Sequence, residues 1–188
     1  MSMNLEIMDT TLRDGEQMKN VSYSPEEKLA LAKILLDEIK VDRIEITSAK
    51  VSIGEKEAVR KIIDWANQYK YTQRVEILGF VDITESVDWI ANLGGKVINI
   101  LAKGSLNHLT NQLKKTKEQH VKEIKETISY AGQKEITCNL WLEDWSNGML
   151  NSPDYVFYLI DNLGEESIER FMLPDTLGIL YPSQVYHF

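Results

Sequence analysis

The chain has 188 residues, enough for one domain with a hydrophobic core, and 43% of them are hydrophobic and 27% charged, which is typical of a globular protein. Its net charge of −8 argues against nucleic acid or an anionic membrane as the main partner. The sequence shows no signal peptide and no stretch of membrane-spanning length, and its single cysteine excludes an internal disulfide, so we expect a cytoplasmic protein.

Short apolar segments alternate with longer amphipathic segments along the whole chain. We expect strands at residues 4–8, 42–49, 74–80, 95–104 and 135–144, and a sixth strand with its loop at 168–178. We expect helices at residues 24–39, 54–69, 84–93, 116–134 and 152–164, and a further one beginning at 181. The capping residues include Ser24, Thr84 and Ser152, and Pro25 and Pro153 suit first helical positions.

Six strand–helix units in succession predict a parallel sheet with crossover helices, either an open doubly wound sheet or a (β/α)8 barrel. The turn between the first expected strand and helix lacks the G-x-G-x-x-G pattern, and no Walker motif occurs in the sequence. Both observations argue against a nucleotide-binding open sheet. The fold class expected is therefore α/β, a TIM (β/α)8 barrel. Residues 1–188 would be the N-terminal part of its catalytic domain and cover about strands 1–6, with strands 7–8 and any C-terminal domain beyond them.

Polar side chains gather at the ends of the expected strands, where a barrel has its active site. They are interspersed with large apolar residues, the composition of a small-molecule pocket. In chain order the strand ends carry Arg13, Asp14 and Gln17; Glu45, Thr47 and Ser48; Leu78 and Phe80; Leu101 and Lys103; Trp141, Glu143 and Asp144; Asp175 and Thr176.

Each of these residues also has a structural interpretation. Asp9 and Arg13 are equally well explained as an ion pair that closes a turn. Glu45 needs a partner if it is buried, which Arg13 or Arg43 would supply. For Lys103 we favour an exposed loop position.

Other residues have a clearer structural interpretation. Asp144 is explained equally well as the cap of a turn. His120 lies in a charged helix and is expected on its solvated face. Cys138 lies among strand residues, so a buried, inert thiol is the expectation.

Two motifs carry a family resemblance. "DTTLRDGEQ" at residues 9–17 and "LPDTLG" at 173–178 resemble segments of the acyl-CoA-dependent condensing enzymes, namely 2-isopropylmalate, citramalate and homocitrate synthases. The segments "RIEITSAKVSIGE", "EILGFVD", "AKGSLNHL" and "LEDWSNGMLNSPDYV" look most like citramalate synthase. The resemblance covers the whole chain.

The resemblance implies a barrel that holds a divalent metal (Mg, Mn or Zn), and condensation of acetyl-CoA with a 2-oxo acid followed by thioester hydrolysis. Arg13 would stabilise the developing oxyanion and Glu143 would act in proton transfer, while Asp14 would be a metal ligand. The remaining implied residues bind the substrate: Gln17, Thr176 and the pocket walls Leu78, Leu101 and Trp141.

The sequence departs from the family pattern at two points. The family takes two metal ligands from an H-x-H pair, which this sequence lacks, so we expect that pair beyond Phe188 and no turnover from residues 1–188 alone. Trp141 stands where the nearest relatives carry tyrosine. The three large side chains of the pocket wall, Leu78, Leu101 and Trp141, leave little room, which favours pyruvate over 2-oxoisovalerate as the 2-oxo acid.

Alternative functions remain open at this point. They are a 2-isopropylmalate synthase that uses 2-oxoisovalerate, a homocitrate synthase, and a lyase resembling 3-hydroxy-3-methylglutaryl-CoA lyase that cleaves a C–C bond. From another class, an inactive half-barrel would act as a binding module. For the active enzyme we expect a homodimer, with no nucleic-acid or membrane partner.

Overall fold

The structure, a computed structural model, describes residues 5–188, so Asn4, the first residue of the first expected strand, lies outside the described residues. The strands are β1 (Met8–Asp9), β2 (Arg43–Ser48), β3 (Val75–Phe80), β4 (Val97–Lys103), β5 (Thr137–Glu143) and β6 (Ile168–Met172). They hydrogen-bond in chain order from β1 to β6. A doubly wound sheet reverses its strand order at a switch point, whereas barrel strands follow one another, so the order agrees with the expected barrel sheet.

Helical segments connect the strands. The α-helices are α1 (Pro25–Lys33), α2 (Ile53–Tyr69), α3 (Glu85–Ala91), α4 (Leu106–His108), α5 (Lys117–Gln133), α6 (Trp145–Asn151), α7 (Pro153–Leu163) and α8 (Pro182–His187). Shorter turns are the 3₁₀ turns η1 (Gly15–Gln17) and η3 (Thr72–Arg74) and the π-helical turns η2 (Ile34–Ile39) and η4 (Leu109–Leu113). In the part of the chain that the structure describes, no helix is long and apolar enough to span a membrane.

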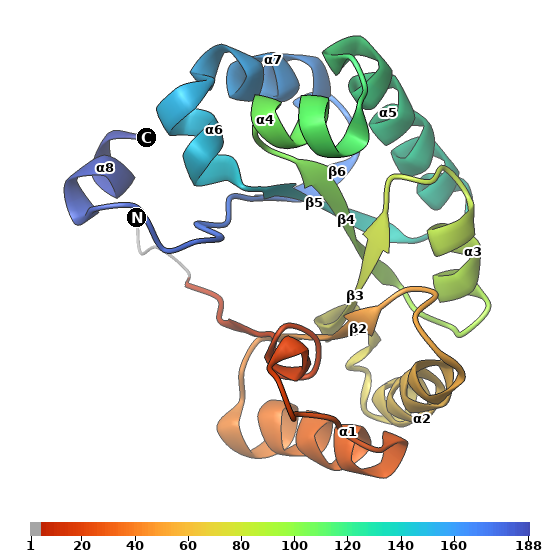
Figure 1. Cartoon of the computed structure of the whole chain (residues 1–188). Helices are drawn as coiled ribbons and strands as arrows, with labels where there is room; N and C mark the ends of the chain where they lie inside the picture. Colours follow the sequence, from red (N-terminus) through yellow and green to blue (C-terminus); the bar gives the residue numbers. More distant parts are fainter. Residues whose placement is uncertain (1–4) are drawn as a thin grey trace. The chain divides into compact units, whose positions relative to one another are not determined.

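The chain packs as two compact units, and the first comprises Met1–Gly79 and Glu85–Ile98. Helices α1 and α2 lie side by side and contact β2 (Figure 1). Ser24 caps α1, as expected, and also forms a reciprocal capping box with Glu27. Ile44 and Ile46 of β2 are fully buried, and so is Ile62 of α2, which places the hydrophobic core between strand and helix.

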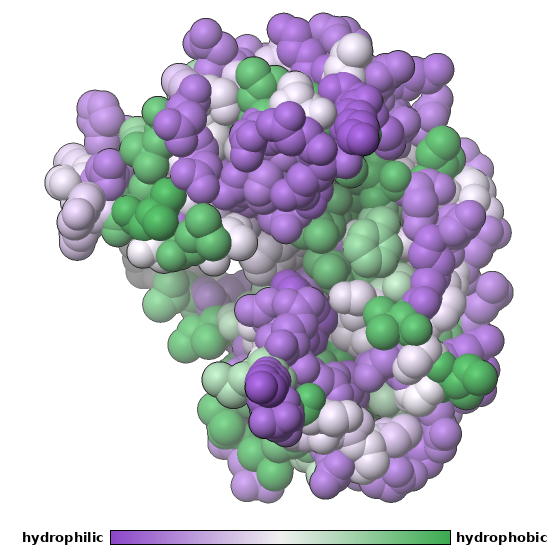
Figure 2. All heavy atoms as spheres, viewed as in Figure 1, coloured by the Kyte–Doolittle hydropathy of each residue, from purple (hydrophilic) through white to green (hydrophobic). Residues whose placement is uncertain are grey.

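The second unit comprises Phe80–Thr84 and Asn99–Phe188. Helix α5 packs against β5 and α7, and α6 packs against α7 (Figure 1). Thr116 and Gln119 cap α5 reciprocally, and its buried face includes Ile124 and Ile128. On the face shown in Figure 2 the helix surfaces are mostly hydrophilic, with apolar residues and small apolar patches among them. This pattern is typical of one-sided helix burial.

Three local features differ from the sequence-based expectation. The first strand is shorter than expected, because ladder pairing with β2 begins only at Met8, while Ile7 is held by Asp42 through its N–H and C=O groups. The helix expected at 24–39 changes to the π-helical turn η2 after Lys33 and ends at Lys40, whose φ of 64° is left-handed. The helical segments 106–113 and 145–151 were not expected.

Candidate functional site

The turn after β1 is closed by its own backbone. The carbonyl oxygen of Thr10 accepts the N–H groups of Arg13, Asp14 and Gly15 at 3.0, 2.8 and 3.2 Å. Asp9 accepts hydrogen bonds from the backbone N–H and the hydroxyl of Thr11 at 2.9 and 3.2 Å. Asp9 therefore holds the turn locally, and the alternative in which it pairs with Arg13 is wrong.

Arg13 is held by two carboxylates of the first unit. Its Nε donates to Glu45 Oε2 at 2.6 Å and its Nη1 to Asp14 Oδ1 at 2.9 Å. Glu45 is fully buried, whereas the Asp14 side chain is 62% exposed. The expected partner of Glu45 is thus Arg13, while Arg43 pairs with other glutamates. Because a buried carboxylate fixes one edge of the guanidinium, its orientation is set before any ligand binds.

Lys28 ties the same turn to the helices. Its side chain is 1% exposed, and its ammonium lies 2.6 Å from Glu16 Oε2 and 2.7 Å from Glu55 Oε2. It also donates to the carbonyl oxygens of Leu12 and Ile46 at 3.1 and 3.4 Å. Sequence reasoning missed this residue, although Lys28, Ala32 and Leu35 share the buried face of the helix. A cavity of about 330 Å³ lies here, lined by residues including Arg13 and Glu16, and by the exposed Gln17.

In the second unit the ends of β4 and β5 carry an ion pair. The Lys103 ammonium contacts the Glu143 carboxylate, and the two side chains are 14% and 27% exposed. The N–H of Gly104 donates to the Glu143 carbonyl at 2.7 Å, and the Tyr155 hydroxyl donates to the Lys103 carbonyl at 3.0 Å. Lys103 is therefore the last residue of a strand with a largely covered side chain, and the expected exposed loop position is wrong.

His120 is fully buried, so its expected place on a solvated face is wrong as well. Its Nε2 accepts the N–H of Lys103 at 3.2 Å. Chiefly through burial, and with the positive charges of Lys115 and Lys103 outweighing an opposing effect of Glu123, the pKa of His120 is lowered to about 4. The ring is thus neutral at pH 7, as an acceptor at Nε2 requires.

Asp144 follows Glu143 and is 3% exposed. It accepts the Ser105 hydroxyl at 2.6 Å and the Asn147 amide at 2.8 Å, and His108 Nε2 lies 3.4 Å away. Its backbone N–H donates to Thr176 Oγ1 at 3.1 Å. Asp144 occupies the N-cap position of α6 but makes no side-chain cap bond there, so its carboxylate joins strand ends instead of capping a helix.

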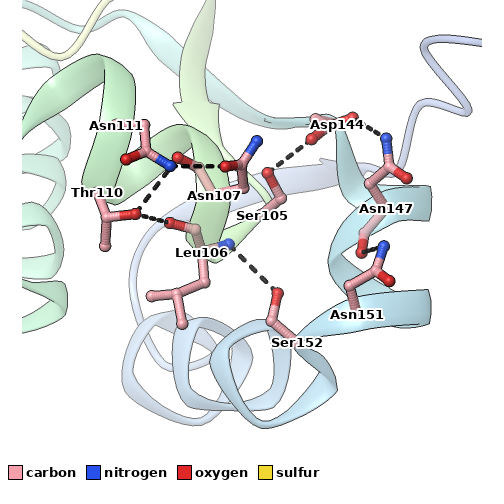
Figure 3. Close-up of a pocket in the computed structure, with 9 residues that line it drawn as sticks. All are labelled: Ser105, Leu106, Asn107, Thr110, Asn111, Asp144, Asn147, Asn151 and Ser152. Carbon is pink, nitrogen blue, oxygen red and sulfur yellow. Dashed lines mark hydrogen bonds between the residues drawn. The ribbon is translucent and has the colours of Figure 1, made fainter.

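A polar cavity of about 460 Å³ lies beside Asp144 in the same unit. Figure 3 shows that hydroxyl and amide groups surround it, from the segment after β4 on one side and from α6 on the other. Its lining comprises Ser105, Leu106, Asn107, Thr110, Asn111, Asp144, Asn147, Asn151 and Ser152. Within it the Leu106 N–H donates to Ser152 Oγ at 3.3 Å, which links the two sides.

The three expected wall residues differ in their burial. Leu78 of β3 is 3% exposed, and Leu101 and Trp141 are half-buried. The indole Nε1 of Trp141 is buried and has no hydrogen-bond partner among the described residues. An unpaired buried donor is costly, so this group is available to an acceptor on a ligand.

Two further residues have structural roles. Asp175 accepts the N–H groups of Ile179 and Leu180 at 3.1 and 3.0 Å, and chiefly the bond from Leu180 lowers its pKa. Cys138 is buried, and desolvation raises its pKa to about 12, so the expected inert thiol is confirmed.

The described residues fit a divalent metal only in part. Asp14 projects an exposed carboxylate of which one oxygen is bound to Arg13. No group of three His, Cys, Asp or Glu side chains suited to a metal occurs within residues 5–188. A complete site would therefore need ligands besides Asp14.

The chain is similar to known proteins along almost its whole length. The chain is 32% identical over 97% of its length to the (R)-citramalate synthase CimA of Methanocaldococcus jannaschii, and 31% identical over 98% to the 2-isopropylmalate synthase of Saccharolobus solfataricus. It spans 35% and 46% of the lengths of these two relatives.

Solved structures give the same fold. The hydroxymethylglutaryl-CoA lyase of Pseudomonas aeruginosa aligns with a TM-score of 0.75 at 16% identity, covering 97% of this chain and 61% of that one. The HMG-CoA lyase of Bacillus subtilis aligns with a TM-score of 0.71 at 23% identity, covering 96% and 61%. These likenesses confirm the expected α/β fold class of the TIM-barrel type. The model of the HMGL-like family matches residues 4–188, and the chain belongs to that family.

Proposed function

We propose that this chain is part of an acyltransferase that condenses acetyl-CoA with a 2-oxo acid and then hydrolyses the thioester, with pyruvate as the favoured 2-oxo acid. The observation that carries the proposal is its similarity, along almost the whole chain, to proteins named as citramalate synthase and 2-isopropylmalate synthase. Two charged pairs support it, Arg13 with Glu45 after β1 and Lys103 with Glu143 at the ends of β4 and β5, because they pre-orient polar groups at strand ends.

In this proposal Arg13 stabilises the oxyanion that develops when the enolate of acetyl-CoA adds to the ketone. Glu45 and Asp14 engage its Nε and Nη1, and we assign Nη2 to the developing charge. A guanidinium that is already oriented loses little entropy when it meets that charge. The exposed amide of Gln17 helps to orient the substrate.

Glu143 transfers protons in this proposal, through a water molecule, and Thr176 binds the carboxylate of the 2-oxo acid. Thr176 Oγ1 accepts the Asp144 N–H, which leaves the hydroxyl proton to be donated to an anion. Leu78, Leu101 and Trp141 are assigned to the surroundings of the substrate's R group. Large apolar groups there favour the methyl of pyruvate over the branched chain of 2-oxoisovalerate.

Asp14 would hold one position of a divalent cation, for which we propose Mg, Mn or Zn. When bound, such a cation would polarise the ketone. Residues 1–188 alone are expected to give no turnover, because Asp14 is the one ligand that the proposal finds among them.

The test is CoA release by the complete gene product that contains these residues, with acetyl-CoA and either pyruvate, 2-oxoisovalerate or 2-oxoglutarate. We expect pyruvate to be fastest, and faster release with 2-oxoisovalerate would refute the substrate assignment. Glu143→Gln should lower kcat about a hundredfold, whereas Glu169→Gln, at a 59% exposed side chain, should leave it unchanged. Cleavage of a 3-hydroxy acyl-CoA without any condensation would favour the lyase instead.

A further inference from the structure

The ion pair between Lys103 and Glu143 differs from the other charged pairs of the second unit in how its ends are held. Long side chains at a surface lose conformational entropy when they form an ion pair, so such pairs contribute little to the stability of the fold. Here the Lys103 side chain is 14% exposed, whereas Lys125 and Lys122, which also pair with glutamates, are 42% and 75% exposed. The stem of Lys103 is therefore largely confined before it meets the carboxylate.

The backbone of Lys103 is fixed from two helices and from the neighbouring strand. Its N–H donates to His120 of α5 at 3.2 Å, and its carbonyl accepts the Tyr155 hydroxyl of α7 at 3.0 Å. The next residue, Gly104, donates to the Glu143 carbonyl at 2.7 Å. A Cβ on Gly104 would lie 2.6 Å from the Leu142 carbonyl oxygen, so the two strand ends are in close contact.

Both helix contacts are stable at neutral pH. Burial keeps His120 neutral, so Nε2 remains an acceptor, and burial raises the pKa of Tyr155, so its hydroxyl remains a donor. Together the two contacts hold the Cα of Lys103, and hence the origin of its side chain, at one place relative to Glu143.

We propose that Lys103 is the positioning residue of Glu143. This inference rests on the proposed function, in which Glu143 transfers protons. The ammonium restricts the carboxylate to one orientation, so that its free oxygen is presented in a fixed direction for proton transfer. His120 and Tyr155 act through Lys103, since they fix its backbone and do not bond to Glu143.

Kinetics of the complete gene product test the role. Lys103→Met removes the charge and keeps the stem, and we expect kcat for CoA release to fall about tenfold or more with KM within about threefold. Lys103→Arg keeps the charge and should recover most of that loss. Lys122→Met is the matched control on an exposed lysine and should change neither parameter. Unchanged kcat in Lys103→Met, or no recovery in Lys103→Arg with a native circular dichroism spectrum, would overturn the proposal.

A second readout needs no turnover. Reductive methylation followed by peptide mass spectrometry should modify Lys103 about fivefold or more slowly than Lys122, and Glu143→Gln should accelerate it, because the covered ammonium loses its partner. Equal modification rates at Lys103 and Lys122 would refute the pairing. Because this comparison uses the wild-type protein, it holds even if Lys103→Met does not fold. If the wild-type protein releases no CoA while Lys103 is protected, the proposed function fails and the pairing stands.

Discussion

Replacing Lys28 by Met gives the sharpest test of what holds the turn after β1. The Lys28 side chain is 1% exposed, and its ammonium contacts Glu16 and Glu55, whose side chains are 19% and 14% exposed. Met preserves most of the apolar stem and removes the charge. Removing one partner of a buried ion pair costs about 3–5 kcal/mol, because the remaining charge is left without compensation. Since both carboxylates keep some contact with water, we expect the lower end, about 3 kcal/mol.

The assay is urea unfolding followed by circular dichroism. With an m-value of about 2 kcal/mol/M, a loss of about 3 kcal/mol lowers the midpoint by about 1.5 M. Lys61→Met is the matched control, because Lys61 also meets two glutamates but its side chain is 36% exposed, and its midpoint should not move measurably. Adding Glu16→Gln and Glu55→Gln to Lys28→Met should recover part of the loss. A midpoint like that of the control, or no recovery, would refute the role of uncompensated charge.

Two further predictions concern the second unit. Gly148→Ala should lower the free energy of unfolding by about 2 kcal/mol or more, because its Cβ would lie 2.1 Å from the Gly104 carbonyl oxygen. Gly132→Ala is the control, because an added Cβ there would have no atom within 4 Å apart from its chain neighbours and its own helix backbone. For this variant we expect a gain in the free energy of unfolding of up to about 1 kcal/mol in urea unfolding. The pKa of His120, about 4 against 6.5, means that the unfolded chain binds its proton first as pH falls below about 6.5. Between pH 7 and 5 the free energy of unfolding of the wild type should therefore fall by about 2 kcal/mol more than that of His120→Gln, measured by urea unfolding. Equal losses in the two proteins would contradict a neutral buried ring.

The strand and helix order could be predicted because periodicity and capping signals agree in the long elements. Helix α2 (Ile53–Tyr69) was expected at 54–69, and α5 (Lys117–Gln133) at 116–134. The short helix α6 gives no such signal, since Asp144 precedes it in a left-handed conformation without a side-chain cap. The π-helical turn η2 was also unpredictable, because it differs from an α-helix in hydrogen-bond spacing and not in composition.

Two polar residues were misplaced because composition was given more weight than position. His120 lies in a helix rich in charged residues, yet it is four residues before Ile124 and eight before Ile128, on the buried face of α5. Lys103 lies near the end of the strand expected at 95–104, where a lysine suggests an exposed loop, but β4 extends to it. Helical spacing would have placed His120 correctly. The pairing of Lys103 with Glu143, however, depends on how two strands 40 residues apart are brought together.

The charges that crowd residues 9–17 separate into two groups by what they touch. Asp9 bonds within the turn, Glu16 neutralises the buried Lys28, and Arg13 is oriented by the buried Glu45. Each of these carboxylates therefore satisfies a group that would otherwise be costly to bury or order. The second group consists of Asp14 and Gln17, whose side chains are exposed. Three charges of the motif bond within the turn or to buried side chains, so they fix the backbone that carries Asp14 and Gln17, and the proposed function would need such a fixed backbone.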